Sequence, residues 1–278
     1  MNISFCNSND KHYQGLLNVL MKQTFLDFQF WYDLNLWDAN YESYSIIQDD
    51  KLVSNICVFK TNIVFSGKHF NALSVGAVAT KAEYRKKGYS RLIMQHIIDK
   101  YSNVPMYLSA NETVVDFYPK FGFKRIYEKL PVAKYVINND IEPVKFDIND
   151  KLCEYVYKKV NFSPVLDCLN TAAVNLFHIH WGYLKDCIYD IQALDTVVIA
   201  EQNKNKLKIK GVFSLRDVCF TDLLMNLPFK GVDIIEFGFM PYWNDCKYEM
   251  TSYEHDPIFV RNVGCDLGDF KFPELSIT

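Results

Sequence analysis

A short basic segment is the first place in the sequence where chemistry is expected. Lys81, Arg85, Lys86, Lys87 and Arg91 place five positive charges within eleven residues. The chain as a whole has a net charge of −3, so this cluster does not reflect a generally basic protein. Phosphate or pyrophosphate is the natural ligand of such a segment. A solvated basic surface without a ligand is the alternative interpretation.

The elements on either side of this segment favour an anion site. Residues 73–80 form an apolar run rich in Val and Ala, which predicts a strand buried on both faces. From Tyr89 to Lys100 the apolar residues recur with helical spacing. The basic segment therefore opens a helix N-terminus, where free N–H groups and the helix dipole attract anions, and Gly88 allows a positive φ there. The phosphate motifs GxxxxGK[ST] and GxGxxG are both absent.

A second motif follows one helix and one strand later. After an expected strand over 104–109 come Asn111 and the segment YPKFGF, which runs from Tyr118 to Phe123. Preceded by R-x-x-G-x-S at 85–90, this order resembles the GNAT superfamily of N-acetyltransferases, where Q/R-x-x-G-x-G/A opens a helix and Y-x-x-x-G-F follows. Ser90 departs from the usual Gly or Ala but is also small. The segment V-A-T-x-x-x-x-R-x-x-G at 78–88 resembles in particular the enhanced-intracellular-survival type of acetyltransferase.

The resemblance implies a donor and a role for each motif residue. Acetyl-CoA would be the co-substrate, with its pantetheine arm beside the backbone of Val78, Ala79 and Thr80 and in contact with Asn111. Tyr118 would be the general acid that protonates the departing thiolate; a core aromatic residue is the alternative. The residues that would hold the pyrophosphate are Arg85, Lys86, Lys87, Gly88, Tyr89, Ser90 and Arg91.

The acceptor side is expected in the aromatic segment from Thr24 to Tyr41, which forms a wall of the acceptor pocket in GNAT proteins. Aromatic faces and carboxylates suit a cationic amine. We take Trp31, Asp33 and Trp37 as candidates, with ordinary helix packing as the alternative. The resemblance also implies that a C-terminal carboxylate, here at Thr278, can serve as the general base.

The sequence also predicts two domains and no metal. A length of 278 residues suggests about two domains. We expect an α/β GNAT domain over 1–136, with a mixed, mostly antiparallel sheet flanked by helices. It is followed by a polar linker over 137–150 and a smaller α+β domain over 151–278. A degenerate GNAT repeat would explain this second domain. His178 and His180 lie two residues apart on an expected helix over 172–186, so they point in different directions, and no third ligand is near in sequence.

The composition indicates the cellular compartment and argues against some classes of partner. The eight cysteines are isolated, no signal peptide precedes them, and no apolar run approaches the roughly 20 residues of a membrane span. We therefore expect a cytoplasmic protein without a membrane partner. A pI near 6.1 argues against nucleic-acid binding. The predicted function is acetyl-CoA-dependent N-acetylation of a small-molecule amine by a monomer or homodimer. A protein or peptide acetyltransferase and a non-catalytic coenzyme-A-binding module are the alternatives.

Overall fold

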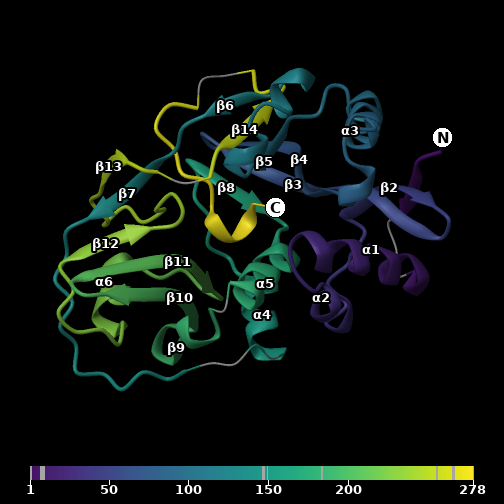
Figure 1. Cartoon of the computed structure of the whole chain (residues 1–278). Helices are drawn as coiled ribbons and strands as arrows, with labels where there is room; N and C mark the ends of the chain where they lie inside the picture. The colour runs from purple at the N-terminus through teal and green to yellow at the C-terminus, as the bar shows by residue number, and fades with distance from the viewer. Residues whose placement is uncertain are drawn as a thin grey trace.

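The chain folds around two β-sheets (Figure 1), and the computed structural model describes residues 2–6, 10–145, 148, 150–182, 184–254, 256–264 and 267–277. Within these residues one sheet has eight strands and the other has six. The first follows the order β1 (Ser4–Cys6), β2 (Tyr41–Gln48), β3 (Lys51–Phe65), β4 (Lys68–Thr80), β5 (Met106–Ser109), β14 (Ile258–Arg261) and β6 (Lys124–Ile126), and β8 (Leu166–Leu169) pairs with β3. The second follows the order β13 (Glu249–Ser252), β7 (Lys129–Ala133), β12 (Ile234–Phe237), β11 (Lys206–Ser214), β10 (Thr196–Asn203) and β9 (Ile188–Ile191).

Helices α1 (Lys11–Thr24) and α3 (Tyr89–Lys100) cover opposite faces of the first sheet. The α1 helix begins at Asp10, whose Oδ1 accepts a hydrogen bond from the Tyr13 N–H (3.1 Å). It buries Leu17, Leu20 and Met21 at helical spacing, and α3 buries Ile93, Met94 and Ile97 in the same way. The expected helix over 89–100 and the mixed, mostly antiparallel sheet are therefore confirmed.

The two sheets exchange strands. β7 follows β6 in the sequence but lies in the second sheet between β13 and β12, so residues 124–133 contribute one strand to each sheet. Conversely, β8 and β14 come from the second half of the sequence and pair in the first sheet. The expected boundaries at 136 and 150 therefore do not coincide with the division between the sheets. Pairing between strands so distant in the sequence cannot be predicted from local sequence patterns.

The second half contributes α4 (Asp150–Lys158), α5 (Ala172–Trp181) and α6 (Phe220–Asn226). The expected helix over 172–186 ends at Trp181, and a separate short helical turn covers Leu184–Cys187. Residues 196–214 form an antiparallel hairpin of β10 and β11. No helix in the described part of the chain is long and apolar enough to cross a membrane.

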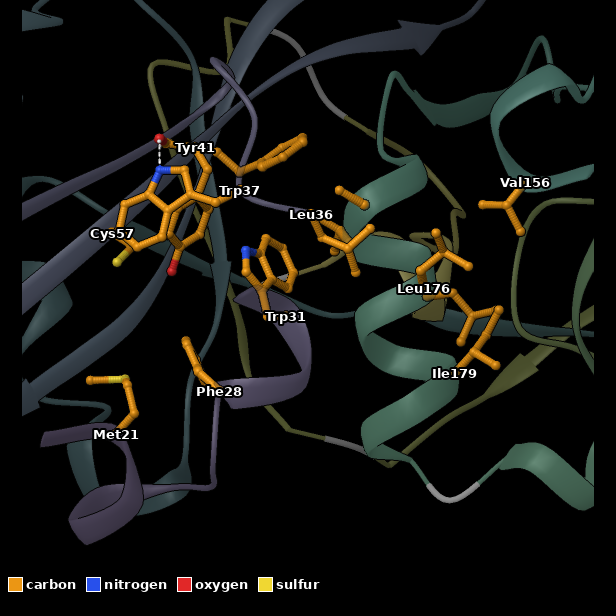
Figure 2. Close-up of a cluster of buried hydrophobic side chains, with 14 of the residues drawn as sticks. Met21, Phe28, Trp31, Leu36, Trp37, Tyr41, Cys57, Val156, Leu176 and Ile179 are labelled. Carbon is orange, nitrogen blue, oxygen red and sulfur yellow. Dashed lines mark hydrogen bonds between the residues drawn. The ribbon is translucent and has the colours of Figure 1, made fainter. Parts of the chain in front are cut away.

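A shared hydrophobic core joins the two halves. The short helix α2 (Gln29–Asp33) packs on α5, and Figure 2 shows Trp31 beside Tyr41 in the core cluster that Leu176 and Ile179 of α5 also join. The Phe177 ring lies 5.3 Å from Phe28 and 5.1 Å from Trp31 between ring centroids, and Phe30 stacks on His180 at 3.9 Å. The aromatic segment of the first half therefore packs against a helix of the second half, and this contact forms one wall of the site below.

Candidate active site

A cavity of about 1040 Å³ lies between the two halves of the chain. Its first-half wall comes from α1, α2, β3, β4 and the residues that follow β5. Its second-half wall comes from α5 and from the segments that flank β14 and end at Ile277. Figure 1 shows the C-terminal end of the described chain beside α5, close to the first sheet. The second half is therefore part of the site and not a separate appendage.

The open edge of β4 lines one side of this cavity. β4 and β5 pair in parallel only at Leu73 with Met106 and at Ser74 with Tyr107. Beyond Ser74 the strands separate, and residues 75–80 of β4 line the cavity. The structure therefore brings the three expected residues Val78, Ala79 and Thr80 to the cavity wall. The backbone along this open edge can bind a ligand that lies beside the strand like an added strand.

The basic turn closes one end of this edge. Gly88 has φ 82° and immediately precedes α3, as its role at the turn requires. Arg85 and Ser90 line the cavity, where Arg85 Nε donates to the Thr80 carbonyl (3.2 Å) and Ser90 Oγ bonds Thr80 Oγ1 (2.7 Å). The cavity lining does not include the other expected residues of the turn, which are Lys86, Lys87, Gly88, Tyr89 and Arg91.

Tyr118 and Asn111 also line the cavity. The Tyr118 side chain is 4% exposed, and burial raises its pKa to about 12, so it is a neutral hydroxyl and a proton donor at physiological pH. Among the described residues no hydrogen-bond partner occupies this hydroxyl, which leaves it available to a ligand. Asn111 Oδ1 accepts a hydrogen bond from the Thr113 N–H (2.9 Å), which fixes the amide and leaves Nδ2 as the donor for a ligand.

Only one of the three acceptor candidates in the aromatic segment reaches the cavity. Trp31 lines it, is 4% exposed, and its Nε1 has no hydrogen-bond partner within the described structure. Trp37 is instead a core residue whose Nε1 donates to the Tyr41 carbonyl (3.0 Å; Figure 2). Asp33 is exposed and accepts a hydrogen bond from Gln29 (2.9 Å). A substrate role for Asp33 and Trp37 is therefore not supported by their positions.

Aromatic residues of α5 complete the acceptor side, and the sequence did not single them out as site residues. Phe177, His178 and Trp181 line the cavity from the second half. His178 Nε2 donates to the Ile277 carbonyl (2.5 Å), and burial lowers the His178 pKa, so its ring is neutral. Phe177, His178 and Trp181 share one face of α5 at i, i+1 and i+4 spacing. This spacing is the sequence pattern that could have identified them as a group. Thr278, the expected base, lies outside the described residues.

A buried ionic cluster forms the end of the cavity that faces the second sheet. Lys271, only 2% exposed, donates to Glu128 Oε2 (3.1 Å) and lies 3.6 Å from Glu274 Oε1. Lys208 also pairs with Glu274 (2.8 Å). Burial opposes ionisation of Glu274, but Lys271 and Lys208 lower its pKa overall. The charges of two carboxylates and two ammonium groups balance in this cluster. Of the carboxylates in the described lining, Asp256 lies outside the cluster.

Comparison with known proteins agrees with this architecture. The family model described as an acetyltransferase (GNAT) domain matches residues 13–126. No curated protein sequence gives a significant match.

Three solved structures share the fold over almost the whole chain. A GCN5-related N-acetyltransferase from Anabaena variabilis is 15% identical, with a TM-score of 0.55 over 95% of this chain and 73% of that one. Eis1 from Mycobacterium abscessus is 12% identical, with a TM-score of 0.54 over 94% and 73%. A protein from Enterococcus faecalis described as a probable N-acyltransferase is 16% identical, with a TM-score of 0.51 over 94% and 73%.

The family match covers β2 to β6, α1 and α3, which are the elements that carry the open strand edge, the basic turn and Tyr118. The structural likeness extends the same fold through the second half. Residues 13–126 therefore match the GNAT acetyltransferase domain, and the chain as a whole shares the fold of these three solved structures.

Proposed function

We propose that this chain transfers an acetyl group from acetyl-CoA to a primary amine of a small molecule. The observation that carries the proposal is one continuous cavity with two chemically different ends. One end has the free edge of β4 and the basic turn, which suit a coenzyme. The other has aromatic walls from α2 and α5, which suit an acceptor. Tyr118 lines the same cavity, so donor, acid and acceptor can meet there.

The coenzyme end supports acetyl-CoA as the donor. The first turn of α3 presents free backbone N–H groups at its N-terminus, and Gly88 with its positive φ lets a ligand approach that backbone closely. Arg85, Lys86, Lys87 and Arg91 surround this turn and add positive charge. Together these groups match a pyrophosphate. The edge of β4 and the Asn111 amide then accommodate the amide-rich pantetheine arm.

The reaction needs few protein groups. The amine nitrogen attacks the thioester carbon, and the carbonyl oxygen becomes an oxyanion that a backbone N–H of β4 stabilises. The carbon–sulfur bond then breaks, and the coenzyme thiolate takes the proton of the Tyr118 hydroxyl. The nitrogen of the new amide releases its extra proton, which restores the Tyr118 hydroxyl. The attacking amine must be neutral, so its ammonium form first loses a proton to a base in the cavity.

The acceptor end favours a small amine over a protein side chain. Helix α5 packs directly on α2, so the two halves cover the cavity between them. Phe25 and Trp181 line this part while remaining 53% and 44% exposed, which places two aromatic faces at its mouth. Such faces bind apolar groups and cations of modest size. A protein acetyltransferase would need an open groove instead.

Two groups are candidates for the base. Thr278 remains a proposal from the resemblance, and its support is that the preceding residue, Ile277, lines the cavity and is held there by His178. Asp256 is the alternative, because it lines the cavity beside the Pro257 carbonyl that accepts a hydrogen bond from the Ala110 N–H (2.9 Å). Removing Thr278 alone and, separately, changing Asp256→Asn should show which group sets the acidic limb of the pH profile.

Acetyl-CoA binding followed by an amine panel tests the function. Calorimetry should show that acetyl-CoA and CoA both bind, and turnover should release CoA in equal amount with acetylated amine detected by mass spectrometry. The panel should pair each small aromatic or aliphatic amine with a lysine-containing peptide. Release of CoA with peptides but not with small amines would move the function to protein acetylation. Coenzyme binding without turnover on any amine would indicate a binding module.

We further propose a cytoplasmic location and a monomeric or homodimeric enzyme.

A further inference from the structure

A bulge interrupts β4 where it lines the cavity. Asn55 of β3 pairs with Ala79 and Cys57 pairs with Gly76, so one residue on β3 faces two on β4. The extra residue is accommodated at Ala77, which adopts φ 48°. A left-handed conformation costs a residue other than glycine about 1–2 kcal/mol. The surrounding structure must therefore hold this bulge in place.

The Asn55 side chain supplies that restraint. Its Nδ2 donates to the Ala77 carbonyl oxygen (3.0 Å) and to Cys57 Sγ (3.1 Å). The orientation of the amide follows from the partners, because a backbone carbonyl can only accept and must face the nitrogen. Asn55 is fully buried, so this contact is not exchanged with water.

A buried hydroxyl cluster fixes the other end of the Asn55 amide. Asn55 Oδ1 accepts hydrogen bonds from Ser43 Oγ and Ser45 Oγ, both at 2.7 Å. These serines lie on β2 directly opposite Cys57 and Asn55. The Tyr13 hydroxyl from α1 lies within hydrogen-bonding distance of both serine hydroxyls, at 2.9 and 2.6 Å. All four hydrogen-bonding positions of the amide are therefore occupied, and the amide cannot rotate without breaking several bonds.

We propose that Asn55 is a positioning residue for acetyl transfer, acting through the bulge; the inference rests on the function proposed above. The Ala77 carbonyl and the Val78 N–H belong to one peptide plane and point in opposite directions. Asn55 lies on β3 and holds the carbonyl toward that strand, so the Val78 N–H is directed toward the opposite, open edge of β4. That edge lines the cavity where the thioester carbonyl would lie. Asn55 thus fixes the donor that stabilises the oxyanion, without contacting the substrate.

The change Asn55→Asp tests the assignment. It keeps the size of the side chain but replaces the donor to Ala77 with an oxygen, which repels the carbonyl. The expected result is a fall in kcat of about ten- to a hundred-fold, because a misdirected oxyanion donor loses part of the effect of a deleted one. Affinity for CoA, which lacks the acetyl carbonyl, should stay unchanged.

A spectroscopic probe separates positioning from general damage. The thioester carbonyl stretch of bound [¹³C-carbonyl]acetyl-CoA should shift to lower frequency in the wild-type protein and less in Asn55→Asp. Asn161→Asp is the matched control: Asn161 is also buried, bridges the backbone of the second sheet at Val212 (2.8 Å) and Ser214 (2.9 Å), and lies outside the cavity. It should lower stability while leaving kcat and the carbonyl frequency unchanged.

The outcomes are distinct. An unshifted carbonyl in the wild-type protein would contradict the proposed function itself. A wild-type shift that Asn55→Asp retains, together with unchanged kcat, would overturn the role of Asn55 alone. If Asn55→Asp does not fold, Tyr13→Phe removes only the outer hydroxyl of the cluster and should lower kcat a few-fold with the carbonyl shift partly lost. Wild-type values for both in Tyr13→Phe would equally overturn the assignment.

Discussion

Replacing Tyr118 with phenylalanine separates chemistry from packing at the centre of the cavity. The Tyr118 ring packs against Phe117 at 5.2 Å, Phe259 at 5.4 Å and Phe123 at 6.0 Å between centroids. Phenylalanine keeps each of these contacts. The lost hydroxyl has no hydrogen-bond partner among the described residues, so we expect the free energy of unfolding to change by only about 0.5 kcal/mol.

The effect on turnover should be much larger. General acid catalysis contributes about 10²- to 10⁴-fold to a rate. The group that leaves here is a thiolate, and thiols have a pKa of about 8.5, so its departure needs less help than that of an alkoxide or amide. We therefore expect a loss near the lower end, about a hundred-fold in kcat, which corresponds to roughly 2.7 kcal/mol of barrier.

The assay is CoA release at saturating acetyl-CoA, with acetyl-CoA affinity measured separately by calorimetry. Tyr248→Phe is the control, because Tyr248 is a half-buried tyrosine of the second half that lies outside the cavity. It should leave kcat unchanged. A Tyr118→Phe protein with wild-type kcat would refute the acid role. A loss of acetyl-CoA affinity in parallel with kcat would instead make Tyr118 a binding residue.

Three further predictions concern the turn, the acceptor mouth and acid stability. Gly88→Val forces a β-branched residue to φ 82° and should weaken acetyl-CoA binding, measured by calorimetry, at least about tenfold. The control Gly67→Val, at φ 71° in the β3–β4 hairpin, should destabilise the fold without weakening acetyl-CoA binding. Trp181→Ala should raise KM for an aromatic amine about tenfold and leave acetyl-CoA affinity unchanged; equal KM values would place the acceptor elsewhere. Burial opposes ionisation of Glu42, but hydrogen bonds from one lysine and two tyrosines lower its pKa from 4.5 to about 2. This carboxylate therefore stabilises the fold above pH 4.5 and loses that contribution as the pH falls toward 2, so Glu42→Gln should flatten acid unfolding over this range; a wild-type slope would contradict the assignment.

Local features of the catalytic half were predictable from the sequence because local interactions determine them. The apolar spacing from Tyr89 to Lys100 gave the bounds of α3, and the glycine in the basic turn has the positive φ that was expected. The same holds for the order of elements from residue 73 to Tyr118. In each case the signal lies within a few residues of the feature that it predicts.

Features that depend on distant partners were not predictable. Nothing near Ile258 shows that β14 inserts between β5 and β6, since that position depends on the sheet left open by the first half. Helix periodicity does not distinguish Trp31, which lines the cavity, from Trp37, which is in the core. The same limit applies to Phe177 and Trp181, whose role arises only when α5 packs on α2. The acceptor side therefore became visible only in three dimensions.

The central claim is that one cavity binds acetyl-CoA and passes its acetyl group to a small amine. Its most direct test is a single reaction with [¹³C-carbonyl]acetyl-CoA and the amine panel, followed by mass spectrometry of the products. The account predicts that the label appears in an N-acetylated small amine, one for each CoA released, and that Tyr118→Phe slows this transfer while acetyl-CoA still binds. Bound acetyl-CoA that transfers no label to any amine, or labelled product formed at wild-type rate by Tyr118→Phe, would contradict it.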